Sequence, residues 1–266
     1  MPPLQEEKYL SARLMRYLPI IFGERGEMAI GVYQYFRKVD DLVDEGDISR
    51  EEKLGYLDRE IGQIKNWQEN EWEETSVWKR LRCSGLPKKK EIYFQAFLEL
   101  NAIRDDVVGG GRAKSDREAR HYNWRTLLPC LEGLALILNG RGIRPTAKFM
   151  KLLDSWNSIG SLIDLEEDAG RGMYQLPLQR TEIEEFNRLN DEERDKFYRG
   201  VIGRRFGDIV KGVFEGLVLN QGSFLKLDLP LWQRYLSFGY MIRADMKTLR
   251  LRGKGSRGVD SKNYQV

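Results

Sequence analysis

The sequence predicts an all-α protein, and three observations support that prediction. Apolar residues recur at spacings of three and four along most of the chain, the periodicity of a helix with one buried face. No alternating pattern long enough for a strand stands out. Short runs of Gly and Pro separate the periodic segments, and none is long enough to be a linker. We therefore expect a single domain, residues 1–266, of seven or eight packed helices.

The predicted helices follow one another between these breaks. The first covers residues 28–45, where apolar residues recur at spacings of three and four: Ile30, Val32, Tyr33, Tyr35, Phe36, Val39, Leu42 and Val43. The remaining periodic segments are 51–68, 91–108, 123–139, 146–168, 194–219 and 231–250. The breaks that separate them lie at 84–87, 109–111, 140–145, 170–177 and 228–230, where Gly and Pro occur. The basic tail 251–266 is expected to be flexible.

Composition excludes several classes of protein. The 266 residues, 41% hydrophobic and 32% charged, are enough for a globular core. The formal charge of +3 comes from 44 basic and 41 acidic residues, and so small an excess argues against a nucleic-acid partner. Cys83 and Cys130 are too few for a disulfide framework or a zinc site, which favours the cytoplasm. We expect neither a signal peptide nor a membrane-spanning helix.

Two acidic clusters with the spacing Asp-x-x-x-Asp stand out. Asp40 and Asp44 form the first, and Asp164 and Asp168 form the second. This spacing puts both carboxylates on one helix face, where like charges repel and destabilise the helix by a few tenths of a kcal/mol. Mg²⁺ prefers oxygen ligands and is usually held by one or two carboxylates together with substrate phosphates. Two such faces turned toward each other would hold a diphosphate through Mg²⁺.

Each cluster continues a polar stripe along its helix. At about 100° per residue, Asn157 and Ser161 lie on the same face as the second acidic pair. Tyr33 and Arg37 lie on the face of the first. An arginine one turn before carboxylates can pair with them when the site is empty, or with a phosphate when it is full. A lone acidic pair is usually a solvated face, but two pairs on otherwise apolar helices favour a binding site.

These residues resemble the squalene and phytoene synthases, which join two allylic prenyl diphosphates head to head. Residues 33–45, YQYFRKVDDLVDE, are similar to the first motif of that family, an aromatic helix leading into Arg-x-x-Asp-Asp-x-x-Asp-Glu. Residues 164–177, DLEEDAGRGMYQLP, are similar to the second, Asp-x-x-Glu-Asp followed by Arg-Gly and Leu-Pro. Leu18-Pro19, Tyr240 and Asp245 fit the pattern more loosely. The resemblance covers residues 9 to about 250.

The resemblance implies an isoprenoid-synthase helical bundle with a central cavity and Mg²⁺ between the acidic helices. It implies catalytic roles for Asp40, Asp44, Asp164, Asp168 and Tyr240. The implied metal ligands are Asp40, Asp41, Asp44, Asp164 and Asp168, and the residues implied to contact diphosphate are Arg37 and Arg171. A carbocation also needs a dry aromatic wall, and the candidates are Tyr33, Tyr35, Phe36, Phe94, Phe97 and Trp156. His121 is expected to be structural or at the surface.

The chain departs from the family where a second substrate would be handled. The family has Asn four residues before the first Asp of its second motif and Arg directly before it, whereas this chain has Gly160 and Ile163. Asn157 or Ser161, on the same helix face, could replace the missing metal ligand. Ionisation of a donor therefore looks intact, and the acceptor is left open.

Three functions remain open. The first is head-to-head coupling of two prenyl diphosphates, and the second is transfer of the prenyl group to an aromatic acceptor or its cyclisation. The third is a non-enzymatic scaffold. A lipophilic product would suit a cytoplasmic enzyme with peripheral membrane contact. Prenyl chain length, the use of NADPH and the oligomeric state are left open.

Overall fold

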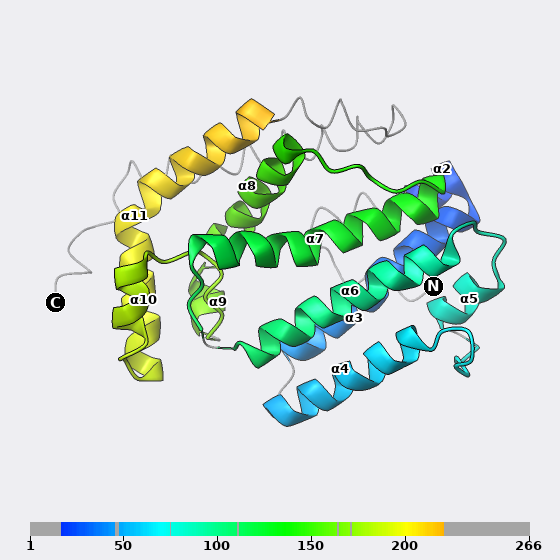
Figure 1. The fold of residues 1–266 in the computed structure, drawn as a ribbon, viewed down its shortest axis with the longest axis horizontal. Helices are drawn as coiled ribbons and strands as arrows, with labels where there is room; N and C mark the ends of the chain where they lie inside the picture. The colour runs from blue at the N-terminus through cyan, green and yellow to red at the C-terminus, as the bar shows by residue number, and fades with distance from the viewer. Residues whose placement is uncertain are drawn as a thin grey trace. The chain divides into compact units, whose positions relative to one another are not determined.

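The computed structural model describes residues 17–45, 48–74, 76–110, 112–163, 165–170 and 172–220. These residues are mostly helical and contain an isolated β-bridge between Ser115 and Leu178 but no longer strand, which confirms the all-α prediction. Their helices, shown in Figure 1, are α2 (Leu18–Phe22), α3 (Glu24–Glu45), α4 (Arg50–Lys65), α5 (Val77–Cys83), α6 (Lys89–Val108), α7 (Asp116–Asn139), α8 (Ala147–Ile163), α9 (Leu165–Gly170), α10 (Arg180–Phe186) and α11 (Asp191–Asn220).

The chain divides into two compact units. Unit 1 comprises residues 1–108 and 125–143, and unit 2 comprises residues 109–124 and 144–266. Helix α7 therefore contributes its first nine residues, 116–124, to unit 2 and the rest to unit 1. A single domain with one central cavity stays a prediction, because it concerns how the two units meet.

Unit 1 is built around buried aromatic rings. Helix α4 packs along α6, and α3 packs against α2 and α5 (Figure 1). Trp78 of α5 is only 1% exposed, and Tyr35 and Tyr93 lie with their ring centroids 4.9 and 5.5 Å from it. The Tyr93 hydroxyl donates a hydrogen bond of 2.6 Å to the Trp78 carbonyl oxygen. This cluster fixes the register of α3, the helix that carries the first acidic cluster.

Unit 2 has a core of its own. Helix α11 packs against α8, α9 and α10. The buried Tyr198 hydroxyl accepts a hydrogen bond of 2.7 Å from the Leu176 amide and donates one of 3.0 Å to the Leu176 carbonyl oxygen, which anchors the segment after α9. A Cβ at Gly216 would meet Ser155 Oγ and lie 3.2 Å from Ser155 Cβ, so α11 approaches α8 closely at this glycine.

Helix boundaries agree with the predicted segments except at short or capped elements. Helices α2, α5 and α10 are five to seven residues long and were not predicted, because so short a helix has too few turns to show a periodic pattern. Helix α7 begins at Asp116, well before the predicted residue 123. The predicted helix 231–250 and the tail lie outside the described residues. None of the described helices is long and apolar enough to span a membrane.

Candidate functional site

The first acidic cluster lies at the C-terminal end of α3. Arg37 bridges two of its carboxylates: Nη1 is 2.8 Å from Asp40 Oδ2, and Nη2 is 2.7 Å from Asp41 Oδ1. All three side chains are partly exposed, at 33–41%. Asp44 follows one turn after Asp40 and is also partly exposed. The pairing expected of an arginine one turn before the cluster is confirmed.

The position of this cluster in α3 is electrostatically unfavourable. The C-terminal end of a helix carries a partial negative charge, so each carboxylate there costs about 0.3–1 kcal/mol. Helix α3 has no basic residue in its last turn, where Asp44 lies, and its other two described cluster carboxylates come one turn earlier. Arg37 offsets part of this repulsion. A bound cation would offset more, so the carboxylates are placed where cation binding is favoured.

A buried carboxyl group faces this cluster from α6. Glu99 Oε2 is inaccessible to solvent and has no hydrogen-bond partner among the described residues. Burial raises the pKa of Glu99 well above its ordinary value, and the charge of Asp40 raises it further. Burial, with Glu99 as a second cause, also raises the pKa of the nearby Cys130 to about 12. The Cys130 thiol is therefore protonated near pH 7, and the surroundings of Glu99 favour its protonated form.

Glu99 belongs to a narrow cavity between α3, α6 and α7. Its volume is about 20 Å³, enough for about one water molecule, so an isoprenoid chain would enter only if these helices moved apart. Tyr33, Phe36 and Trp78 contribute aromatic rings to its lining, and Gln95 and Glu99 contribute polar groups. Glu99 was missed by the sequence reasoning because it occurs singly in an otherwise ordinary amphipathic helix.

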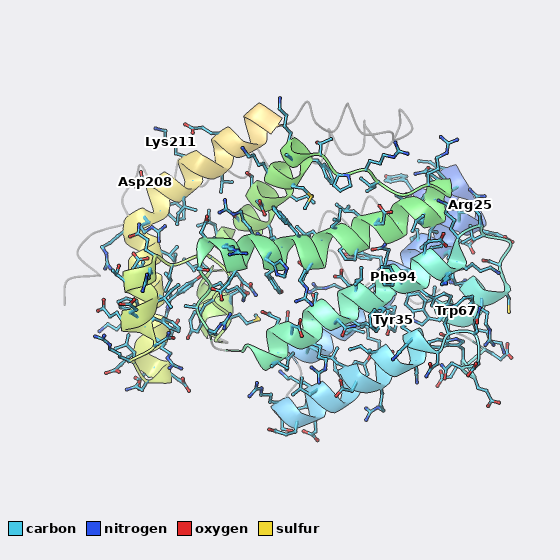
Figure 2. All side chains as sticks on the ribbon, viewed as in Figure 1. Arg25, Tyr35, Trp67, Phe94, Asp208 and Lys211 are labelled. Atoms are coloured by element: carbon cyan, nitrogen blue, oxygen red, sulfur yellow. The ribbon has the colours of Figure 1, made fainter. Side chains whose placement is uncertain are left out.

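The proposed aromatic wall is only partly assembled. Tyr33 and Phe36 line the narrow cavity, and Trp78, which was not predicted, joins them. Tyr35 instead lies in the core and donates a hydrogen bond of 2.6 Å to Glu60 (Figure 2). Phe94 is 54% exposed, so its assignment to a dry wall is wrong, since the apolar face of α6 turns its neighbours rather than Phe94 inward.

The remaining candidates are two aromatic residues, Phe97 and Trp156, and the histidine His121. Phe97 stacks on Phe94 with ring centroids 6.5 Å apart. The side chain of Trp156 lies outside the described residues. His121 is exposed on α7, as expected of a surface residue.

The second acidic cluster is described only in part. Asp164, Arg171 and Tyr240 lie outside the described residues, so their predicted roles stay predictions. Asp168 lies in α9, where its carbonyl oxygen accepts a hydrogen bond of 2.8 Å from the Met173 amide. The proximity of Asp168 is one of the causes that raise the pKa of Tyr198, after burial.

The two residues predicted to replace the missing metal ligand do lie together. Ser161 Oγ donates a hydrogen bond of 3.2 Å to the Asn157 carbonyl oxygen. The Asn157 side-chain amide donates to Asn123 Oδ1 of α7. Asn157 is thus held by a protein partner. Its own amide oxygen, an acceptor, is the atom that a metal would need.

Asn157 and Ser161 line an open cleft within unit 2. The cleft has a volume of about 500 Å³, within the usual range for small-molecule sites. Its walls come from the start of α7, from α8, from the segment 175–177 and from α11. Asp154, one turn before Asn157 on the same face of α8, also lines it. Asp154 could have been predicted, because it extends the polar stripe of Asn157 and Ser161 by one turn toward the N-terminus of α8.

Asp154 is the most perturbed carboxyl group of this cleft. Partial burial raises its pKa from 3.8 to about 6, although hydrogen bonds from the Trp124 and Asn123 side chains and the charge of Arg120 oppose the rise. Asp154 Oδ1 is buried and has no hydrogen-bond partner among the described residues. A partly buried acid that titrates near neutral pH in a cleft is a common property of functional sites.

The α3 carboxylates fit Mg²⁺ if phosphate oxygens or water complete its coordination. Carboxylates are its preferred protein ligands, and it is commonly held by only one or two of them with phosphate oxygens and water. Within the part of the chain that the structure describes, no three acidic, histidine or cysteine side chains come together as a metal site. The α3 carboxylates therefore suit an ion shared with a phosphate-bearing ligand, rather than an ion enclosed by protein alone.

Comparison with known proteins adds no assignment. No protein-family model matches the chain, and no curated protein matches it.

Proposed function

We propose that the protein is a Mg²⁺-dependent prenyltransferase that ionises an allylic isoprenoid diphosphate and couples it head to head with a second prenyl diphosphate. The observation that supports this most directly is the Arg37 bridge to Asp40 and Asp41 on α3, beside the aromatic lining of the narrow cavity. A diphosphate site needs both a cationic side chain and carboxylates. Here Arg37 lies about one turn before Asp40 and Asp41 on α3.

In this proposal Arg37 changes partners when substrate arrives. Its guanidinium releases Asp40 and Asp41 and donates the same hydrogen bonds to diphosphate oxygens, a geometry that arginine makes well. One or two of the carboxylates of Asp40, Asp41 and Asp44 would hold Mg²⁺, which would supply neutralising charge for the departing diphosphate. The allylic C–O bond breaks, and its electron pair leaves with the diphosphate. The rings of Tyr33, Phe36 and Trp78 stabilise the cation that remains.

A second candidate is transfer of the prenyl group to a non-isoprenoid acceptor. The cleft that Asn157 and Ser161 line has both polar and apolar walls, and its polar side chains suit a polar acceptor better than a second isoprenoid chain. Cyclisation of the bound chain is the third outcome to be distinguished.

The test is incubation of the purified full chain with Mg²⁺ and one allylic diphosphate at a time: dimethylallyl, geranyl, farnesyl or geranylgeranyl. Released diphosphate and the organic products are measured by mass spectrometry. A C30 or C40 hydrocarbon supports head-to-head coupling. Alcohols or cyclic products alone support a different acceptor or a cyclase, and absence of diphosphate release contradicts the proposal.

A substitution at the first cluster tests the metal assignment. Asp40→Ala should lower turnover by more than a hundredfold, because loss of a metal ligand removes several kcal/mol of charge stabilisation. The matched control is Asp208→Ala, which removes an exposed carboxylate from α11 (Figure 2) and should leave turnover unchanged. Activity of the Asp40 variant within tenfold of wild type would contradict the assignment.

A further inference from the structure

We infer that the cleft of unit 2 binds a neutral, polyhydroxylated small molecule, with the hydroxyl oxygens of Ser158 and Ser161 as its principal hydrogen-bond acceptors. The inference does not depend on the prenyltransferase proposal, because every residue that carries it lies in unit 2 and none is an aspartate of the acidic clusters. Its basis is the distribution of donors, acceptors and charges over the walls of the cleft.

The wall formed by α8 presents hydrogen-bond acceptors. Ser158 Oγ donates to the Asp154 carbonyl oxygen at 2.8 Å, and Ser161 Oγ donates to the Asn157 carbonyl oxygen at 3.2 Å. Each hydroxyl proton is thereby used, and each oxygen keeps lone pairs for the cleft. Asp154 also lines this wall, but its Oδ1 is buried and has no surface that a ligand in the cleft could contact.

The other walls present donors. Arg120 of α7 pairs with Asp116, and Arg205 of α11 pairs with Glu182 at 3.0 Å. A guanidinium group has five N–H donors, so one such pairing leaves several for a ligand. Lys151 of α8 is exposed and also lines the cleft.

The charges select a neutral ligand. Arg120 is paired with Asp116, and Arg205 is paired with Glu182. Lys151 and Asp154, which also line the cleft, carry opposite charges, so the cleft has little net charge to attract an ion. A hydroxyl group both donates and accepts, so a molecule with several hydroxyl groups can satisfy the acceptors of α8 and the donors of the opposite walls together.

The cleft also has a surface for carbon atoms. Leu176, Pro177, Ile209 and Val213 supply apolar contacts on one side. A sugar or cyclitol has a ring face of C–H groups and a rim of hydroxyls. That division matches the apolar and polar walls, and the volume of about 500 Å³ is sufficient for such a ring.

Two glycines of α11 provide a matched test. A Cβ at Gly212, in the wall of the cleft, meets no atom within 4 Å, and the same is true at the exposed Gly207, which does not line it. Gly212→Leu therefore fills the cleft without a clash, while Gly207→Leu makes the same change elsewhere in the same helix. Replacement of glycine by leucine raises helix propensity equally at the two positions, so the two variants should not differ in stability for that reason.

The experiment measures binding of sucrose, D-glucose and myo-inositol to the full chain by saturation-transfer NMR and calorimetric titration. We expect saturable binding of at least one. Gly212→Leu should abolish it, and Gly207→Leu should not. Ser158→Ala should weaken it about three- to tenfold, the effect of losing one neutral hydrogen bond. Absence of saturable binding of all three to wild type, or equal binding by the two leucine variants, overturns the inference.

Asp40→Asn separates this inference from the proposed function. It lies in unit 1, so it should remove prenyl-diphosphate turnover and leave the affinity for the hydroxylated probe unchanged. Loss of both turnover and probe binding in this variant would contradict the independence of the cleft. Loss of probe binding with turnover retained would contradict the inference about the cleft alone.

Discussion

At the residue scale, Glu99 and Asp154 have, among the described carboxyl groups, the pKa values that burial raises most. Sequence patterns did not predict either residue. Glu99 and Asp154 each have a buried oxygen without a partner among the described residues, and each has a raised pKa caused chiefly by burial. Helical spacing identifies residues that share a face, and it placed Arg37 beside Asp40, with which it forms an ion pair. It carries no information on depth, because burial depends on which other helix covers that face.

Asp154 should make stability depend on pH. Its pKa is about 6 in the folded chain and 3.8 in the reference state, so the native state binds the proton more tightly. Stability attributable to this residue is therefore present at low pH and is lost as pH rises from about 4 to about 6. Asp154→Asn, which cannot ionise, should gain stability relative to wild type across that interval.

Urea unfolding at a series of pH values checks this prediction. The difference in midpoint between Asp154→Asn and wild type should grow in favour of the variant as pH rises through the interval. Asp208→Asn, the same change at an exposed position of α11, is the control and should show no such trend. A difference that is independent of pH would show that the pKa of Asp154 is the same in the folded and the unfolded chain.

Ser161 tests the predicted replacement of the missing family ligand. Its hydroxyl donates to the Asn157 carbonyl oxygen and lines the cleft. If Ser161 is also a Mg²⁺ ligand, Ser161→Ala should raise the Mg²⁺ concentration needed for half-maximal turnover several-fold. Ser158→Ala, one turn away with the same helical hydrogen bond, is the matched control. An unchanged Mg²⁺ titration removes Ser161 from the metal site.

At the element scale, the starts of several helices could have been read from short polar signals. The pattern Ser-x-x-Glu occurs at Ser49–Glu52, where both reciprocal hydrogen bonds of a capping box are present and α4 begins at the next residue. The same pattern at Ser115–Glu118 precedes α7, whose start the apolar periodicity placed too late. Apolar spacing predicts where a helix is buried, whereas caps predict where it begins.

Removal of the α4 cap gives a measurable cost. Ser49→Ala removes the side-chain acceptor for the Glu52 amide. It keeps the Ser49 backbone amide, whose hydrogen bond is the largest cause of the lowered pKa of Glu52. The free energy of unfolding should fall by about 1 kcal/mol. Gln63→Ala, an exposed position in the interior of α4, should change it by less than about 0.5 kcal/mol. Equal effects of the two would show that the cap does not hold the helix end.

At the scale of the whole molecule, the sequence predicted the helical class and most helix positions, but not the division into two compact units. That division depends on long-range contacts and falls inside α7, where no break in the periodic pattern marks it. For the same reason, the predicted approach of the two acidic clusters could be stated only as an expectation. The first belongs to unit 1 and the described part of the second belongs to unit 2.

Separate cores should respond separately to mutation. Phe186 is fully buried in the core of unit 2, and Phe186→Ala should destabilise that unit by about 3–5 kcal/mol. Amide hydrogen exchange should then increase more in α10 and α11 than in α4 and α6. Leu57→Ala, which empties a fully buried position of unit 1, should give the opposite pattern. Uniform acceleration along the chain in both variants would indicate one cooperative core.

The hydrogen bond from Trp124 to Asp154 gives the cleft an optical reporter of its own. Because the indole N–H points to a carboxyl group with a pKa of about 6, the charge at the end of that bond changes across neutral pH. The fluorescence of Trp124, isolated by replacing the other tryptophans with phenylalanine, should follow this change as a single titration. A ligand that donates to Asp154 would move the midpoint of the titration to lower pH. Binding of a ligand in the cleft could then be followed in solution by tryptophan fluorescence.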